Sequence, residues 1–270
     1  MAAATDAAAD VLVRHNVVVR GTGRPIVFAH GFGCSQAMWR YVAPAFEADH
    51  QVVLFDYVGA GGSDSSAYRP GKYDSLEGYA TDVLDIMAAL DLRDAVFVGH
   101  SVSTMVGVLA ANRDPSRFGQ LVLVSPSPRY IDDGDYVGGF QQQDIDDLLD
   151  SLDANYVGWS ETMAPVIMGN PDRPDLGLEL TDSFCRYEPT IARQFARVTF
   201  LSDHRRDLDA VTVPTAVIQC VDDLIAPMPV GRFVHEHIAG STFTVIAASG
   251  HVPNLSAPAE VTAAIKEALR

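Results

Sequence analysis

A segment near the middle of the chain places a serine at a sharp turn between a strand and a helix. Residues 95–98 form a short apolar run typical of a buried strand, and residues 104–112 have a helical pattern. Between them lies Gly99-His100-Ser101-Val102-Ser103. A serine at such a turn holds its hydroxyl above the sheet, beside the positive end of the following helix, where a developing negative charge is stabilised. The pattern favours a nucleophile at Ser101, and a serine that only caps the helix is the alternative.

Two downstream segments place an acid and a base in the positions that such a nucleophile requires. Residues 215–220 and 242–247 are short, β-rich apolar runs, followed by Asp222-Asp223 and by Ser249-Gly250-His251 respectively. The chain order is therefore serine, acid, histidine, each just after a predicted strand. Ser–His–acid triads in sheets of alternating strands and helices have this order. The sequence predicts a triad of Ser101, one of the two aspartates and His251.

An upstream segment supplies a candidate oxyanion hole. Residues 25–29 are predicted to form a buried strand that ends in His30-Gly31-Phe32-Gly33. The glycines let the backbone come close to a substrate. We therefore expect the N–H groups of Phe32 and Val102 to donate together to an oxyanion and stabilise it.

The pattern along the chain predicts an α/β fold with a mostly parallel, doubly wound sheet. Alternating strands and helices of ordinary length imply parallel β-α-β units with helices on both faces. Strands are expected at residues 11–20, 25–29, 51–55, 95–98, 120–124, 215–220 and 242–247. Helices are expected at residues 35–47, 75–90, 104–112 and 257–269.

The alternation is interrupted between residues 126 and 213, where no convincing core strand is found. Within this stretch Ile145, Leu148, Leu149 and Leu152 follow helical spacing among aspartates, which is typical of a helix with one apolar and one solvated face. A second helix is expected at residues 190–201. We interpret residues 126–213 as a helical cap over the carboxyl ends of the strands of a core formed by residues 1–125 and 214–270.

Composition excludes several classes of partner and location. A formal net charge of −16 opposes binding to nucleic acid or to anionic membrane surfaces. The apolar runs are too short to span a bilayer, and the first ten residues lack the features of a signal peptide. The three cysteines have neither a disulfide nor a zinc-ligand spacing, so we expect a cytoplasmic protein without a metal or cofactor.

Several motifs in the chain resemble one branch of the α/β-hydrolases, which contains the bacterial stress-response regulator RsbQ and the plant receptors for strigolactones and karrikins. Besides the glycine turn at Phe32 and the turn at Ser101, the matching segments are Asp56-Tyr57-Val58-Gly59, Gly62-Ser63-Asp64, Ser127-Pro128-Arg129-Tyr130, Asp135-Tyr136-Val137-Gly138-Gly139-Phe140 and Gly250-His251-Val252-Pro253 with Leu255-Ser256-Ala257-Pro258. In that branch a serine often stands at the position of Ser103, where the general elbow pattern has glycine.

The resemblance implies an α/β-hydrolase fold with a four-helix, V-shaped lid over a deep apolar pocket. It implies a triad of Ser101, Asp223 and His251, because the acid of the family lies four residues before a loop proline, here Pro227. It also implies Phe32 and Val102 as oxyanion donors and activity on small esters or butenolide-like lactones. Six bulky side chains of the cap are candidates for the pocket wall, each with the alternative of packing in the cap core: Phe140, Tyr156, Trp159, Met163, Phe195 and Phe200.

Two functions remain open at this point. One is a serine esterase or lactonase that acts on a small apolar ligand. The other is a slow-turnover ligand sensor of the RsbQ type, which would signal through its cap to a protein partner such as a stress-response phosphatase. A carbon–carbon bond hydrolase or a cofactor-free perhydrolase would use the same triad and is a third possibility.

Overall fold

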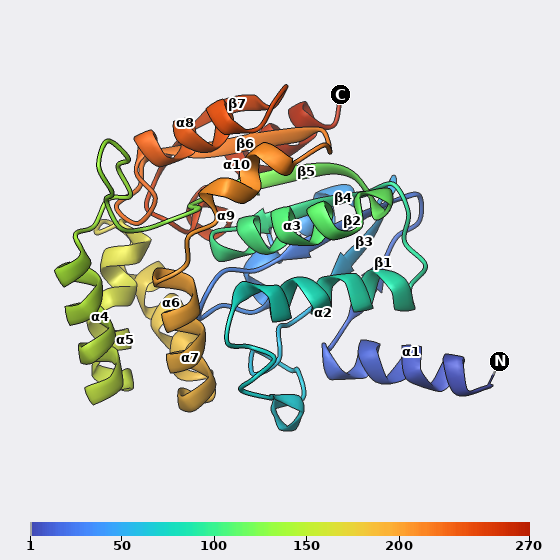
Figure 1. The fold of residues 1–270 in the computed structure, drawn as a ribbon, viewed down its shortest axis with the longest axis horizontal. Coiled ribbons are helices and arrows are strands. Elements are labelled where there is room, and N and C mark those ends of the chain that lie inside the picture. Colours follow the sequence, from blue (N-terminus) through green and yellow to red (C-terminus); the bar gives the residue numbers. More distant parts are fainter. Residues whose placement is uncertain (1) are drawn as a thin grey trace.

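The computed structural model describes residues 2–270, in which seven strands form one sheet in the order β1-β3-β2-β4-β5-β6-β7 (Figure 1). The strands are β1 (Val18–Arg20), β2 (Arg24–Ala29), β3 (His50–Leu54), β4 (Ala95–His100), β5 (Phe118–Val124), β6 (Thr215–Asp222) and β7 (Thr242–Ser249). β1 is antiparallel to β3, and every other neighbouring pair is parallel. The expected mostly parallel sheet is confirmed.

The helices follow the strands in the expected alternation. The α-helices are α1 (Ala2–Arg14), α2 (Leu76–Ala89), α3 (Val102–Arg113), α4 (Gln142–Ala154), α5 (Tyr156–Met168), α6 (Pro174–Cys185), α7 (Pro189–Phe200), α8 (Met228–His237), α9 (Pro253–Ser256) and α10 (Pro258–Ala268). The 3₁₀ helices are η1 (Gln36–Trp39), η2 (Ala43–Phe46), η3 (Ser65–Ala67), η4 (Pro115–Arg117) and η5 (Arg205–Ala210).

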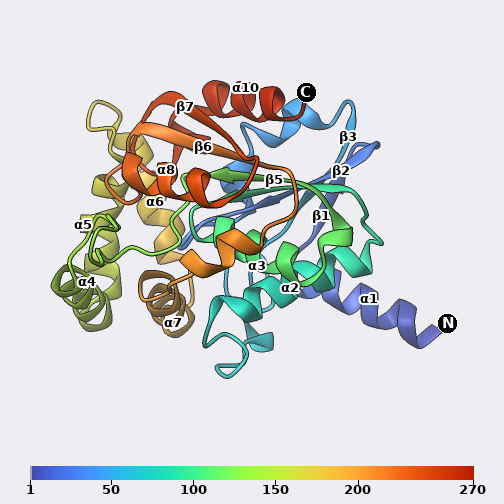
Figure 2. The ribbon, with the colours of Figure 1, turned by 45° about the horizontal axis from the view of Figure 1, so that its top comes forward.

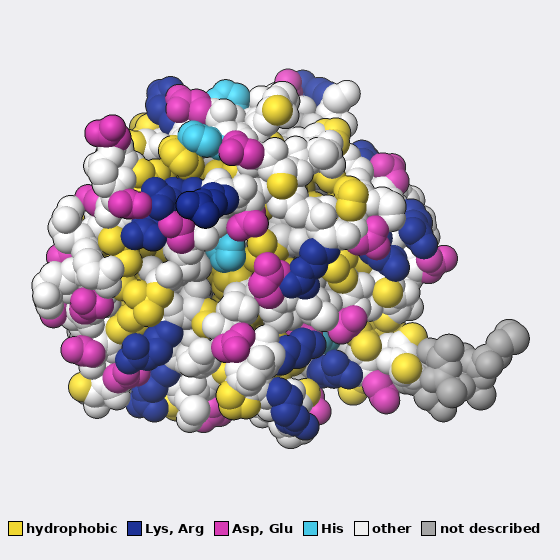
Figure 3. Space-filling view, viewed as in Figure 1, with side chains coloured by type: hydrophobic (Ala, Val, Ile, Leu, Met, Phe, Trp, Pro, Cys, Tyr) yellow, Lys and Arg dark blue, Asp and Glu magenta, His cyan; other side chains and the backbone are white. Residues whose placement is uncertain are grey.

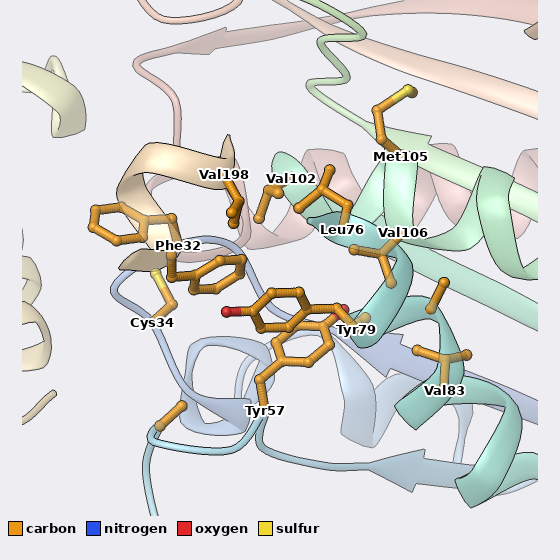
Figure 4. Close-up of a cluster of buried hydrophobic side chains, with 14 of the residues drawn as sticks. Phe32, Cys34, Tyr57, Leu76, Tyr79, Val83, Val102, Met105, Val106 and Val198 are labelled. Carbon is orange, nitrogen blue, oxygen red and sulfur yellow. The ribbon is translucent and has the colours of Figure 1, made fainter. Parts of the chain in front are cut away.

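Both faces of the sheet are covered, because successive side chains of each strand point to opposite sides. Val27 of β2 packs in the apolar cluster that includes side chains of α2 and α3, whereas its neighbour Ile26 packs in the cluster that includes α10. Figure 2 shows the sheet between α10 on one side and α2 and α3 on the other. Figure 4 shows part of the first cluster, which contains Tyr79 of α2, Val106 of α3, Phe32 from the turn after β2 and Val198 from α7 of the cap.

Two expected elements near the N-terminus differ from the structure. Residues 11–14, expected as the start of a strand, belong to helix α1, and the strand β1 is confined to Val18–Arg20. The alanine-rich stretch before Val11 favours a helix, which outweighs the β preference of the valines. The single helix expected at residues 35–47 is instead two 3₁₀ helices, η1 and η2. Pro44 has no N–H to donate and its ring clashes with the preceding turn, so one continuous helix cannot form through it.

Helices α4 to α7 form the insertion between β5 and β6, so the expected helical cap of four helices is confirmed (Figure 1). The buried face of α4 consists of Ile145, Leu149 and Leu152, and its aspartates lie on the opposite face, as predicted. The helical pattern that continues from α4 to Trp159 is divided at Asn155. The side chain of Asn155 accepts a hydrogen bond from the N–H of Gly158 and begins α5.

The cap contacts the core at the backbone beside His251. The N–H of His251 donates to the carbonyl of Ile167 at the end of α5, at 2.9 Å. The Asn170 side chain donates to the carbonyl of Ser249, also at 2.9 Å. Gly250 has a φ of +86°, and a Cβ on it would lie 1.8 Å from the carbonyl oxygen of Met168. The close approach of cap and core therefore requires glycine at position 250.

Acidic and basic side chains are interspersed on the face shown in Figure 3. Ion pairs at the protein surface include Arg40 with Glu179 and Arg129 with Asp203. Over residues 2–270, none of the helices combines the length and the apolarity that crossing a membrane would require.

The substitution Gly250→Ala is expected to destabilise the fold much more than Gly240→Ala. Gly240 has a similar φ of +72°, but a Cβ on it would have no atom within 4 Å, so it carries the backbone strain without the clash. We expect Gly240→Ala to lower the free energy of unfolding by about 1 kcal/mol and Gly250→Ala by about 3 kcal/mol or more. Urea denaturation measures both values, and equal losses would contradict the close docking of α5 on residue 250.

Candidate active site

Ser101 lies in the sharp turn between β4 and α3, in a backbone conformation that is rare for residues other than glycine. Its φ is 57° and its ψ is −125°. The turn is held by hydrogen bonds on both sides: Ser101 N–H donates to the Val124 carbonyl of β5 at 2.9 Å, and the Ser101 carbonyl accepts from the N–H of Thr104 at 2.9 Å. Strained backbone held in this way is frequent at functional sites.

The three side chains predicted as a triad form a continuous hydrogen-bonded chain. Nε2 of His251 lies 2.7 Å from Oγ of Ser101, and Nδ1 of His251 lies 2.8 Å from Oδ2 of Asp223. All three side chains are buried. An ionised carboxylate can only accept, so Nδ1 carries the proton and Nε2 is left to accept the serine proton. This geometry allows the serine hydroxyl to transfer its proton to the imidazole.

Asp223 is ionised although it is buried. Burial alone would raise the pKa of Asp223, but the neighbouring His251 and the N–H groups of Ala226 and Ile225 outweigh burial and lower it below its usual value. These two N–H groups donate to Oδ1 at 3.0 and 2.9 Å. The side chain of the adjacent Asp222 is exposed, and only its backbone contacts the histidine loop, where its carbonyl accepts from the N–H of Gly250.

His100 holds the backbone of the loop that carries His251, a contact that the sequence did not suggest. Its Nε2 donates to the backbone carbonyl of His251 at 2.6 Å. Burial, together with the nearby His251, lowers the pKa of His100 to about 3, so its ring is neutral near pH 7. A neutral ring that already donates to a carbonyl acts as a fixed support. The two histidines are 151 residues apart in the sequence, so no local pattern could have linked them.

The backbone amides of Phe32 and Val102 lie beside Ser101, and neither has a hydrogen-bond partner among the described residues. Phe32 follows Gly31, where a Cβ would lie 2.8 Å from Nδ1 of His100, so this turn requires glycine. Buried N–H groups without a partner are rare in folded proteins. These two can donate to an oxygen of a bound ligand.

A narrow cavity lies above Ser101, between the core and the cap. Its volume is about 30 Å³, which has room for roughly one or two water molecules. The wall is mostly apolar, and its residues come from both parts of the chain: Gly31, Phe32, Cys34, His100, Ser101, Tyr130, Ile167, Leu180, Phe184, Thr199, Phe200, Ile225, His251 and Val252.

Of the six cap residues expected in the pocket wall, the structure places only Phe200 at this cavity. Phe140, Trp159 and Met163 instead line a separate groove between α4 and α5. The Trp159 ring stacks on Phe184 of the cavity wall, with ring centroids 5.6 Å apart, so these two rings lie between groove and cavity.

The other two residues, Tyr156 and Phe195, pack inside the protein. The Tyr156 hydroxyl donates to the Phe184 carbonyl at 2.8 Å, and the Phe195 ring stacks on Tyr79 with centroids 4.3 Å apart. Helical spacing indicates that a side chain is buried, but it does not indicate which of several buried surfaces the side chain meets.

Most of the wall was not identified from the sequence, including the bulky side chains of Tyr130, Ile167, Leu180 and Phe184. Tyr130 belongs to the Ser127-Pro128-Arg129-Tyr130 motif, and that motif was the signal that could have identified it. In the part of the chain that the structure describes, no group of three His, Cys, Asp or Glu side chains is arranged to bind a metal ion.

Comparisons with known proteins agree with this architecture. Residues 26–265 match the model of the alpha/beta hydrolase family. A probable esterase from Oryza sativa subsp. japonica is 40% identical over 247 residues, which cover 90% of this chain and 91% of the relative. A strigolactone esterase of Arabidopsis thaliana is 37% identical over 262 residues, which cover 96% of this chain and 98% of the relative.

A solved structure has the same fold over almost its whole length. A hydrolase from Oleispira antarctica superposes with a TM-score of 0.94 at 37% identity, covering 96% of each chain. The family model, the identities and this superposition all cover both the core and the cap. The chain therefore belongs to the alpha/beta hydrolase family, in the branch that contains the strigolactone and karrikin receptor-like proteins.

Proposed function

We propose that this hydrolase cleaves a small apolar ester or lactone, with Ser101, His251 and Asp223 as its catalytic triad. His251 would take the proton of the Ser101 hydroxyl as the oxygen attacks the substrate carbonyl. The carbonyl oxygen, now negative, would accept hydrogen bonds from the amides of Phe32 and Val102. His251 would then give its proton to the leaving alcohol oxygen, and water would release the acyl group from Ser101 by the same steps.

The observation that carries this proposal is the unbroken chain of hydrogen bonds from Ser101 through His251 to Asp223. It lies at the floor of the cavity, next to the two amides that lack a partner among the described residues. A serine with a base, a carboxylate and unpaired donors beside it is what acyl transfer requires.

The apolar wall of the cavity supports an apolar substrate, and a cavity of about 30 Å³ must widen to admit even a compact one. Phe32, Phe184 and Phe200 narrow the space above Ser101, and a polar or bulky acyl group would meet these rings. A relative in Acinetobacter baylyi, 24% identical over 233 residues, is named 3-oxoadipate enol-lactonase 1, and the Arabidopsis relative is named a strigolactone esterase. These names support a lactone, such as a butenolide, as the natural substrate class.

The division into core and cap supports a lid function for residues 126–213 over a core of residues 1–125 and 214–270. The cavity wall takes Ile167, Leu180 and Phe200 from the insertion and the triad from the core, so substrate would enter between the two. The three cysteines are unpaired, which supports the expected cytoplasmic location.

A ligand sensor that signals through a protein partner is the second candidate. It is favoured by a relative from Petunia hybrida, 38% identical over 247 residues, which is named karrikin insensitive 2 receptor CA. The two functions differ in turnover. A sensor would release its product over minutes and change partner binding with ligand, whereas an enzyme would turn over rapidly without a partner.

The substitution Ser101→Ala is expected to abolish hydrolysis of a short-chain nitrophenyl ester. Without the nucleophile only the oxyanion donors and the bound geometry remain, so kcat should fall by about 10³-fold or more. Initial rates measure the loss, and Ser116→Ala, an exposed serine away from the cavity, is the control. Equal rates for wild type and Ser101→Ala would refute the serine mechanism.

The substitution Asp223→Asn is expected to lower kcat by about 10³-fold at pH 7 while the fold is retained. The amide oxygen can still accept from Ile225 and Ala226, but the negative charge that holds the Nδ1–H tautomer of His251 is lost. Asp222→Asn is a matched control, because it removes the same charge from the neighbouring, exposed residue. Similar losses in both variants would contradict the role of Asp223.

The substitution Phe184→Ala is expected to shift the substrate preference toward longer acyl chains. Removing the ring enlarges the cavity above Ser101, so the ratio of kcat/KM for an octanoate ester to that for an acetate ester should rise about tenfold. Phe46→Ala removes a buried ring from the opposite face of the sheet and serves as a control for lost stability. An unchanged ratio in Phe184→Ala would show that this ring does not limit the substrate.

A further inference from the structure

Ser103 makes a connection that glycine, the usual residue of the elbow pattern at this position, cannot make. It lies in the first turn of α3, one residue after Val102, and is fully buried. Its Oγ lies 2.5 Å from the carbonyl oxygen of His30, in the turn that leads to Phe32. The hydroxyl of Tyr57 lies 2.8 Å from the same Oγ. One side chain thus joins the elbow, the oxyanion turn and the loop after β3.

The chemistry of the three groups determines the direction of these hydrogen bonds. The His30 carbonyl has no proton, so it accepts and the Ser103 hydroxyl donates. Since the single proton of Ser103 is used in that bond, its oxygen accepts from the Tyr57 hydroxyl. The hydrogen bond to the His30 carbonyl therefore depends on the Ser103 hydroxyl alone. Tyr57 holds that hydroxyl in place by donating to its oxygen.

The turn itself is held by the ring of His30. The N–H of Tyr57 donates to Nε2 of His30 at 3.3 Å, and Nδ1 of His30 donates to the Gly31 carbonyl at 2.9 Å. This arrangement needs a neutral ring with its proton on Nδ1. Burial lowers the pKa of His30 and outweighs the negative charge of Asp56, which acts in the opposite direction. The lowered pKa keeps the ring neutral.

We propose that Ser103 is a positioning residue that sets the separation of the two oxyanion donors, the amides of Phe32 and Val102. This inference rests on the proposed function of the same site. Val102 precedes Ser103 directly, and Phe32 lies two residues after His30, so a single hydrogen bond ties the two donors together. Their separation determines whether both amides reach one oxygen, and a small misplacement in such a site reduces the rate strongly.

The test compares Ser103→Ala with Ser160→Ala. Ser160 is also fully buried, but its hydroxyl donates to the Tyr156 carbonyl one turn earlier in its own helix, so it controls for the loss of a buried hydroxyl. We expect Ser103→Ala to lower kcat for a nitrophenyl ester by about 10- to 100-fold with KM within about twofold of wild type. Ser160→Ala should leave kcat nearly unchanged. A loss in Ser103→Ala that appears only in KM, or that matches Ser160→Ala, would overturn the proposal.

Tyr57→Phe separates the bond to His30 from the rest of the network. Ser103 still donates to the carbonyl in this variant, so we expect kcat to stay within about threefold of wild type. A loss as large as that of Ser103→Ala would show that the whole cluster acts as a structural unit and would overturn a specific role of Ser103. If Ser103→Ala does not fold, Ser103→Cys, which fills the space with a slightly larger side chain but donates weakly, is expected to show the same selective loss of kcat.

Amide hydrogen exchange gives a readout that does not depend on turnover. Exchange of a peptide covering residues 29–34 should be faster in Ser103→Ala than in wild type and unchanged in Ser160→Ala. Labelling of Ser101 by a fluorophosphonate tests the proposed function separately. Absence of labelling in wild type would refute that function, whereas unchanged exchange in Ser103→Ala would refute the positioning role whatever the labelling shows.

Discussion

The site depends on the parallel pairing of β4, β5, β6 and β7, which lie next to one another in the sheet. Parallel strands end at the same edge, so the residues that follow β4, β6 and β7 meet there although they are far apart in the chain. Ser101 follows β4, Asp223 follows β6, and His251 follows β7 after a single glycine. The intervening strand, β5, holds the serine turn through the Val124 carbonyl.

The site also depends on a carboxylate, that of Asp223, which is ionised although it is buried. A charge without partners would be very unfavourable at this depth. At Asp223, two backbone N–H groups and the His251 ring make ionisation favourable. The His251 carbonyl accepts a hydrogen bond from His100 of the core, and the His251 N–H donates to the Ile167 carbonyl of the cap. The position of His251, the proposed base, therefore depends on both the core and the cap. The docking of α5 at Gly250 would then affect the proposed chemistry as well as the stability.

Strong periodic patterns predicted the elements that are buried on both sides or amphipathic. The strands at residues 95–98 and 215–220 and the acidic helix around Ile145 were expected within a few residues of their observed limits. Weaker patterns were misleading where two propensities compete. At residues 11–14 the helix begun by the alanines continues through valines that favour a strand, and at residues 35–47 one proline divides a helical pattern into two short turns.

The sequence by itself determined the alternation of strands and helices over most of the chain, the presence of the cap, and Ser101 and His251 of the triad that we propose. Those features depend on local turn chemistry and on the edge at which parallel strands end. The choice of Asp223 over Asp222 came from the family resemblance. Only the tertiary structure decided which cap side chains face Ser101, because several helices bury aromatic rings in different directions: Phe200 meets the cavity, whereas Phe195 packs on Tyr79. It also decided the contacts of His100 with His251 and of Ser103 with His30, which join residues 151 and 73 positions apart. Such contacts result from the packing of whole elements, and no local pattern encodes them.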